Sequence, residues 1–195
     1  NMEKTENAVR SRLLEAGKEE FRDRGFLKAS LRAICKKADV TTGALYFFFE
    51  SKAALFEEIV KETVEKLKEL TRDFSNREKQ LQPEEYDRIL MEFIWENRDI
   101  ARILMDGAEG TRYDNFREDT CIRMEQFLRE NLQKKCGKEV DSDLVHILAE
   151  TKLQGYSELL RGDYSKEKFM EIFRMLKICS CQSFLAVAAE INRNQ

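Results

Sequence analysis

Two threonines, a glycine and an alanine follow one another at Thr41, Thr42, Gly43 and Ala44. The threonine hydroxyls suit hydrogen bonds to phosphate oxygens, and the threonine methyl groups suit contact with the methyl group of thymine. Gly43 allows the backbone to approach a partner closely because it carries no side chain. Residues of these types read base edges when they stand at the start of a helix in the major groove. The four residues therefore suit contact with double-stranded DNA.

A short helix before these residues would help to place them. Leu31, Ile34 and Cys35 share one face of that helix, at spacings of three and four residues. Ser30 precedes the helix, where its hydroxyl accepts from free backbone N–H groups as an N-cap. Ser30 and Arg32 are then candidates for contact with a phosphate or a base edge.

A tight turn and a second short helix follow. Residues 38–40 are too few for another element and suit a turn between helices. Thr41 or Thr42 caps the second helix, which carries Leu45 and Phe49 on its apolar face. Two short helices joined by a turn of three or four residues form a helix-turn-helix, whose second helix enters the major groove of DNA.

The order of residues across this motif is specific. The chain reads Ala33-Ile34, then Ala38-Asp39-Val40-Thr41-Thr42-Gly43-Ala44-Leu45-Tyr46, then Phe49 and Ser51-Lys52-Ala53-Ala54-Leu55-Phe56. This pattern closely resembles the DNA-binding domain of TetR-family transcriptional regulators. The resemblance covers roughly the first 56 residues, and beyond them it is only architectural.

The resemblance implies roles for further residues. Tyr46 matches a tyrosine that packs and hydrogen-bonds to backbone phosphate in the family. Lys52 matches a lysine that binds phosphate at the start of the next helix, aided by the helix dipole. Lys36 and Lys37 are looser candidates, because a solvated surface charge explains each of them equally well.

Phe47 and Phe48 depart from the family pattern, which often has histidine, tyrosine or another polar residue there. Three consecutive phenylalanines cannot all point inward on a helix. One of them can join the core with Phe49, so we expect Phe47 to be exposed at the DNA face. There it would lie against a thymine methyl or the sugar backbone.

Charge is divided unevenly along the chain. The whole chain of 195 residues has a formal net charge of −3. Residues 1–56 hold 11 Lys and Arg against 8 Asp and Glu, whereas the remainder holds 23 against 29. A basic head on an acidic body suits DNA contact at one end.

Helical periodicity continues to the end of the chain, and no segment alternates as a strand does. We expect an all-α fold of about nine helices. Its parts are a three-helix helix-turn-helix head (1–56), joined by a long helix to about residue 74, and a helical ligand-binding and dimerisation domain (57–195). A polar break is expected at 75–82. Other expected helices span 4–24, 98–105 and 113–136, or begin at Pro83, near Asp141 or Ser142, and near Ser165.

Two sets of apolar residues in the body are candidates for binding. A small-molecule pocket, mostly apolar, would draw on aromatic and methionine side chains, although such stripes more often form core. Those candidates are Phe93, Trp95, Met105, Tyr113, Phe116, Met124, Phe127 and Tyr156. The last two helices carry apolar residues on more than one face, so one stripe would serve a symmetric partner, as in the family's four-helix dimer interface. Those candidates are Leu159, Leu160, Phe173, Leu176, Phe184 and Val187.

An enzyme is not expected. The sequence has no Gly-rich phosphate loop, no nucleophile elbow and no evident metal-binding cluster of His, Cys and Glu, and its single histidine limits acid–base chemistry. We expect no catalytic residue, no metal and no cofactor, and we expect His146 to be a core or interface residue. The five cysteines lack the spacing of a disulfide framework and read as reduced thiols in a cytoplasmic protein. No signal peptide and no transmembrane helix are expected.

The favoured hypothesis is a ligand-responsive repressor. It would bind a near-palindromic operator as a homodimer and be released by a small hydrophobic effector. An all-helical module that binds another protein is one alternative. It would not explain the residue pattern at 41–46 or the net positive charge of residues 1–56. A regulator that responds to thiol oxidation, at Cys121 or Cys179, is the other.

Overall fold

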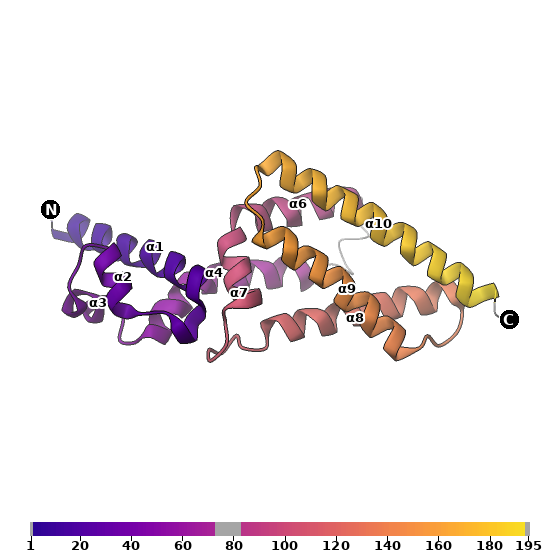
Figure 1. The fold of residues 1–195 in the computed structure, drawn as a ribbon, viewed down its shortest axis with the longest axis horizontal. Coiled ribbons are helices and arrows are strands. Elements are labelled where there is room, and N and C mark those ends of the chain that lie inside the picture. Colours follow the sequence, from indigo (N-terminus) through magenta and orange to yellow (C-terminus); the bar gives the residue numbers. More distant parts are fainter. Residues whose placement is uncertain (1, 73–82, 194–195) are drawn as a thin grey trace. The chain divides into compact units, whose positions relative to one another are not determined.

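The structure is a computed structural model that describes residues 2–72 and 83–193, and these residues form helices and the turns between them (Figure 1). No strand occurs in the described ranges, so the expected all-α fold is confirmed. The helices are α1 (Met2–Lys28), α2 (Leu31–Lys37), α3 (Thr42–Phe48), α4 (Lys52–Arg72), α6 (Pro83–Glu96), α7 (Arg98–Asp106), α8 (Phe116–Cys136), α9 (Ser142–Arg161) and α10 (Lys166–Arg193).

The chain divides into two compact units, Asn1–Asn115 and Phe116–Gln195. The first unit holds α1 to α7, and the second holds α8, α9 and α10. The first unit thus includes more than the helix-turn-helix head. The functional division expected after residue 56 stays a prediction.

Aromatic rings form the core of the first unit. Phe21 of α1 and Phe56 of α4 meet edge to face with centroids 5.1 Å apart, and Phe26 packs on Phe56 at 5.4 Å. Gly17 lets α1 and α4 pack closely, because a Cβ at this position would lie 2.9 Å from Ile59 Cδ1. Such edge-to-face pairs and large apolar side chains hold the head firmly on α4.

The turn between α2 and α3 has well-defined ends. Ser30 Oγ accepts from Ala33 N at 3.4 Å, so Ser30 caps α2 as expected. Val40 N donates to Cys35 O at 3.0 Å, and Asp39 adopts a left-handed conformation with φ of 53°. A left-handed residue followed by a hydrogen bond back into the last turn is a common way to end a helix. The turn therefore redirects the chain sharply into α3.

A close approach of two glycines joins α1 to the end of α7. Gly25 has φ of 71° and interrupts α1, and a Cβ at Gly107 would lie 3.1 Å from Gly25 Cα. Phe26 N donates to Gly107 O at 2.8 Å. The expected end of the first helix at Gly25 is therefore a kink followed by one more turn. Only residues without side chains fit on both backbones here.

The long helix α4 buries the apolar line expected for it. Phe56, Val60 and Leu70 are buried, as is the hydroxyl-bearing Thr63. Thr63 Oγ1 donates to Asn97 Oδ1 at 3.2 Å, which ties α4 to the junction of α6 and α7. The expected continuation to Phe74 and the polar break at 75–82 lie outside the described residues.

Helix α6 begins at Pro83 as expected, but it is less buried than its composition suggested. Among its described side chains Met91 is buried, whereas Phe93 and Trp95 are half-buried. Arg98 places its guanidinium 4.4 Å from the centroid of the Trp95 ring. The described part of α6 is therefore only partly buried within the chain.

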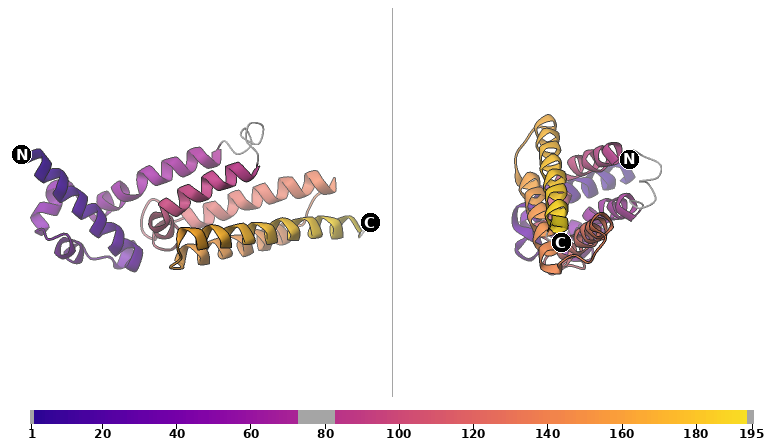
Figure 2. Two further views of the ribbon diagram at one scale, coloured as in Figure 1. Left: turned by 90° about the horizontal axis from the view of Figure 1, so that it is seen from above. Right: turned by 90° about the vertical axis from the view of Figure 1, so that its right-hand side faces the viewer.

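The second unit is a bundle of three consecutive helices, with α8, α9 and α10 linked by short connections (Figures 1 and 2). Asp141 caps α9 by accepting from Leu144 N at 2.8 Å, and Ser165 Oγ accepts from Lys168 N at 3.3 Å at the start of α10. Lys138 Nζ donates to Ile191 O at 2.8 Å, near the end of α10. A cation at the carbonyl end of a helix interacts favourably with the negative end of the helix dipole. The contact of Lys138 therefore fixes the α8–α9 loop on α10.

Candidate nucleic-acid interface

Helix α3 presents one face to the core and the other to solvent. Leu45 is fully buried and Phe49 is 4% exposed, which anchors the helix. Thr42, Tyr46 and Phe47 are exposed, at positions that lie on one side of an α-helix. These three predicted DNA-contacting residues therefore share one outward face of α3, whereas Ala44 is half-buried.

Two predicted DNA contacts also shape the motif itself. Thr41 is the N-cap of α3, since its Oγ1 accepts from Ala44 N at 3.1 Å. Ser30 has the same role on α2. In both residues the hydroxyl oxygen serves the helix, while the hydroxyl hydrogen is still able to donate to a phosphate. These two side chains thus hold the starts of α2 and α3 in the absence of DNA.

Gly43 is the most informative residue on α3. A Cβ at this position would meet only Thr41 Oγ1, at 3.8 Å, so the folded chain has room for a side chain. Glycine within a helix costs up to about 1 kcal/mol relative to alanine. The packing of the protein gives no reason for this cost. A partner that must approach the backbone of α3 supplies one.

The three consecutive phenylalanines separate as expected. Phe49 is buried, Phe48 is half-buried and Phe47 is 72% exposed. Phe47 and Phe48 meet edge to face with centroids 4.9 Å apart, which steadies the exposed ring. The prediction that Phe47 is exposed on α3 is confirmed.

Lys52 makes contacts within the chain. Its Nζ donates to the carbonyl oxygens of Phe26, Leu27 and Ala29, at 2.7, 3.3 and 3.2 Å. An ammonium group has three hydrogens, so these carbonyls use all of them in this structure. The lysine thus closes the carbonyl end of α1 onto the start of α4, and the phosphate contact expected for Lys52 stays a prediction.

Helix α3 has no charged residue, so any cation that meets phosphate must come from another helix. Helix α2 carries several. Arg32 and Lys36 are exposed there. Lys37 forms an ion pair with Glu19 of α1. Arg10 of α1 pairs with Glu58 of α4. The exposed cations of α2 are thus better placed than Lys52 to meet phosphate oxygens.

The candidate ligand-binding residues fall in both compact units. Phe93, Trp95, Met105 and Tyr113 belong to the first, and Phe116, Met124, Phe127 and Tyr156 belong to the second. Tyr113 lies in the core of the first unit, where it is 8% exposed, and its role in ligand binding stays a prediction. Its hydroxyl donates to Glu57 Oε1 at 3.0 Å and accepts from Arg112 at 2.8 Å, and its ring packs on Phe56.

Two candidate dimer residues also belong to the core. Leu159 is 4% exposed and Phe173 is 7% exposed, and Phe173 packs on Tyr156 with centroids 5.7 Å apart. The other candidates, Leu160, Leu176, Phe184 and Val187, are half-buried. Sequence reasoning missed the apolar side chains that face solvent. Those on α9 and α10 are Ile147, Met175, Ile178 and Leu185.

Helix α10 is long and apolar enough to cross a membrane, judged by length and composition alone. Only 11% of its most apolar window is buried within the chain. No such helix was expected from the sequence, because it has no uninterrupted run of about 18 apolar residues. Large exposed apolar surfaces often mark sites of protein–protein or membrane contact.

His146 was expected in the core or at an interface, and the core alternative was wrong. Its side chain is 58% exposed on α9 and its Nδ1 lies 2.6 Å from Glu125 Oε1. The carboxylate of Glu125 raises the pKa of His146. Cys35 and Cys121 are buried, whereas Cys179 and Cys181 are exposed.

Comparison with known proteins agrees with the motif. Residues 13–59 match the family model for bacterial regulatory proteins of the tetR family. The HTH-type transcriptional regulator UidR of Escherichia coli K12 is 42% identical over 60 residues, which is 31% of each chain. The HTH-type transcriptional regulator YdgC of Bacillus subtilis is 34% identical over 101 residues, or 48% of this chain and 51% of that one. The chain therefore matches a third to a half of the length of these relatives.

Solved structures extend the likeness to the whole fold. A transcriptional regulator of the TerR/AcrR family from Aquifex aeolicus shares 25% identity, with 88% of this chain and 99% of that chain covered and a TM-score of 0.56. A TetR-family transcriptional regulator from Chloroflexus aurantiacus covers 95% of this chain and is 92% covered itself, at 16% identity and a TM-score of 0.58. Residues 13–59 therefore match the tetR family of bacterial regulatory proteins, and the whole chain shares the all-helical fold of these solved regulators.

Proposed function

We propose that the chain is a repressor that binds a near-palindromic DNA operator as a homodimer. The outward face of α3 carries this proposal. Thr42, Gly43, Tyr46 and Phe47 are open to solvent there, while Leu45 fixes the helix from below. Residues 13–59, which match the family model, contain this face.

The exposed face of α3 suits contact with the major groove through uncharged side chains. The threonine methyl groups and the ring of Phe47 suit thymine methyl groups, and Gly43 lets the backbone come close to the bases. Arg32 and Lys36 of α2 supply the contacts to phosphate, which set position rather than sequence. Base reading and phosphate binding are thus divided between α3 and α2.

A second copy of the chain is the proposed partner of α10. The exposed apolar residues Met175, Ile178 and Leu185 lie on this helix, whose Phe169 and Phe173 are buried within its own unit. A helix that packs on α8 and α9 in this way suits a subunit interface better than a membrane. We therefore propose a cytoplasmic dimer, with half-sites about one helical turn, ~34–36 Å, apart.

The effector is proposed to be a small hydrophobic molecule. Support comes from half-buried aromatic and methionine side chains in both units, including Phe93, Met124 and Phe127. A ligand shifts DNA affinity only if it binds the DNA-competent and incompetent arrangements differently. A tenfold change needs only ~1.4 kcal/mol of coupling.

Binding to the DNA beside the protein's own gene tests the proposal. We expect a mobility shift with the full chain, and we expect Thr42→Trp to abolish specific binding because the bulky ring blocks the start of α3. Thr71→Trp is the matched control, since Thr71 is also exposed but lies on α4. Equal binding by both variants and the wild type would refute the assignment of α3.

A further inference from the structure

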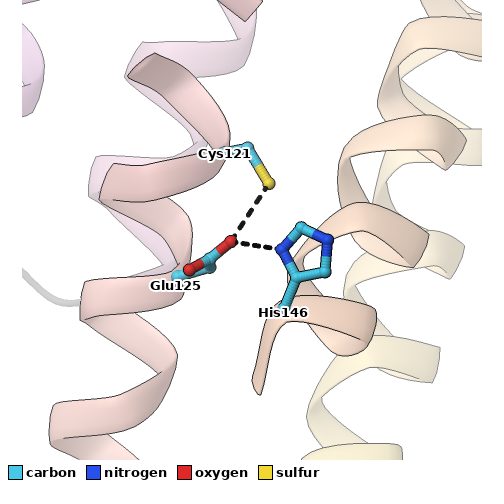
Figure 3. A group of neighbouring side chains, drawn as sticks. All are labelled: Cys121, Glu125 and His146. Carbon is cyan, nitrogen blue, oxygen red and sulfur yellow. Dashed lines mark hydrogen bonds and ion pairs between the residues drawn. The ribbon is translucent and has the colours of Figure 1, made fainter. Parts of the chain in front are cut away.

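Three side chains of different chemistry meet between α8 and α9 (Figure 3). Cys121 and Glu125 lie four residues apart on α8, and His146 faces them from α9. Cys121 Sγ is 3.7 Å from Glu125 Oε1, and His146 Nδ1 is 2.6 Å from the same oxygen. The three potential ligand atoms lie within 4.8 Å of one another. Two helices of one unit thus bring a thiol, a carboxylate and an imidazole to one point.

Spacing explains why these residues converge. Residues four apart lie on the same face of a helix, so Cys121 and Glu125 form one pair. His146 and Glu150 form a second pair on α9. Glu150 is held by a two-fold hydrogen bond to Arg117 of α8, at 3.2 and 2.7 Å. That contact fixes α8 and α9 in register at the cluster.

The surroundings of Cys121 favour a cation. The thiol is 3% exposed and lies 3.7 Å from a carboxylate oxygen of Glu125. A buried thiol beside a carboxylate is a poor candidate for an oxidation switch. A divalent metal ion would be the largest local charge at such a site and would hold a coordinating thiol in its deprotonated form.

We propose that Cys121, Glu125 and His146 bind a divalent transition-metal ion of the Zn²⁺ class. Solvent supplies a fourth ligand on the side where His146 is exposed, and Glu150 stays paired with Arg117. Binding replaces the thiol proton of Cys121, and any proton on His146 Nδ1, which leave to solvent. No electron is transferred. The site is separate from the proposed hydrophobic effector and does not depend on DNA binding.

The donor set and the distances select this class of metal. Zn²⁺ accepts sulfur, nitrogen and carboxylate ligands in a tetrahedron, whereas Mg²⁺ and Ca²⁺ prefer oxygen alone. Tetrahedral zinc bonds of ~2.0–2.3 Å place ligand atoms roughly 3.3–3.8 Å apart. The separation of Cys121 from Glu125 already fits this range. His146 must move less than about 1 Å away from Glu125, and its exposed position on α9 leaves room for that rotation.

Cobalt absorption and histidine NMR test the site directly. The full chain is prepared without a histidine tag, reduced, treated with chelator and titrated with Co²⁺ or Zn²⁺. We expect one ion per chain and a thiolate-to-Co²⁺ charge-transfer band in the near ultraviolet. The chain has a single histidine, so its imidazole signals report on His146 alone. We expect these signals to shift as Zn²⁺ is added.

Matched variants separate the site from nonspecific binding. His146→Gln and Cys121→Ser each remove a ligand, so we expect Zn²⁺ affinity to fall at least about 100-fold. His146 is exposed, so its variant keeps the fold, which a thermal melt checks. Cys136→Ser is the control, because Cys136 is also on α8 but lies beside Ala188 instead. A wild type without the thiolate band, unshifted His146 signals, or equal affinity in wild type and His146→Gln would overturn the proposal.

Discussion

Gly43 is a single residue at which stability and the proposed function oppose each other. The folded chain has space for a methyl group there, yet α3 carries no side chain at this position. We expect Gly43→Ala to raise the free energy of unfolding by up to about 1 kcal/mol, because the unfolded chain loses freedom. The same methyl group should weaken operator binding by keeping the backbone of α3 away from the bases.

Chemical denaturation and an operator titration together measure this trade. Gly155→Ala is the control, because Gly155 lies in α9 and a Cβ there would meet only Leu176 Cδ2, at 3.8 Å. It should also stabilise the chain but leave operator affinity unchanged. If Gly43→Ala bound the operator as tightly as the wild type, close backbone approach would not be the reason for the glycine.

Lys52 and Lys36 should differ in kind when they are replaced. Lys52→Met leaves three backbone carbonyls without their partner, so we expect the free energy of unfolding to fall by about 1–3 kcal/mol. The slope of binding against salt concentration should not change. Lys36→Gln should lower that slope by about one charge and leave stability unchanged.

Melting curves and binding at several salt concentrations distinguish the two lysines. A reduced salt slope in Lys52→Met, with normal stability, would instead support the phosphate contact expected for Lys52. Sequence position alone cannot decide this. The carbonyls that bind Lys52 belong to residues more than twenty positions earlier, which only the folded backbone brings near.

Local chemistry was predictable at residue scale, whereas distant partners were not. The caps at Ser30 and Thr41 and the exposure of Phe47 follow from helix geometry within one or two turns. The exposed position of His146 and its contact with Glu125 depend on how α8 and α9 align. No short-range pattern in the sequence carries that information.

At the scale of elements, an ion pair between α1 and α4 should make stability depend on acidity. Lys61, followed by Arg10, holds the pKa of Glu58 below its ordinary value of 4.5. A lowered pKa in the folded chain means that this stabilisation is present above about pH 4.5 and is lost as the pH falls further. Glu58 is partly exposed, so the effect should stay under about 1 kcal/mol.

Melting temperatures across pH 3–7 measure this contribution, and the pH range follows from the ordinary carboxyl pKa of ~4. We expect Glu58→Gln to be less stable than the wild type at neutral pH and to lose less stability on acidification. Glu62→Gln, an exposed change on the same helix, should follow the wild type. If the wild type and Glu58→Gln lost stability in parallel on acidification, Glu58 would not contribute to the pH dependence.

The positions of the helices could be predicted at this scale, but which face of each helix is buried and which is exposed could not. Pro83, Gly137 and Asp141 mark helix ends through backbone chemistry, and the structure has helix ends at each of them. Leu159 and Phe173 look like Ile178 in sequence, because all three are apolar residues on the last two helices. Only packing shows that the first two are buried and the third is exposed.

At the scale of the whole molecule, that distinction predicts the outcome of two substitutions on α10. Ile178→Glu places a charge on an exposed apolar face, so we expect a folded monomer that has lost operator binding. Phe173→Glu buries a charge in the core of the second unit and should instead unfold it. Light scattering and circular dichroism measure assembly and folding. A dimeric Ile178→Glu variant would place the subunit interface elsewhere.

The exposed apolar surface of α10 also has a consequence for the chain just after its synthesis. In a newly synthesised, folded chain the 28-residue helix α10 is still exposed to water, because only 11% of its most apolar segment is buried. If a second copy covers this helix, as proposed, a chain that has not yet met one is exposed to aggregation and to the cell's chaperones and proteases. Encounter between copies depends on concentration, so the yield of working regulator should rise more steeply than its rate of synthesis. A regulator of this build would be sparse below a threshold of expression and abundant above it.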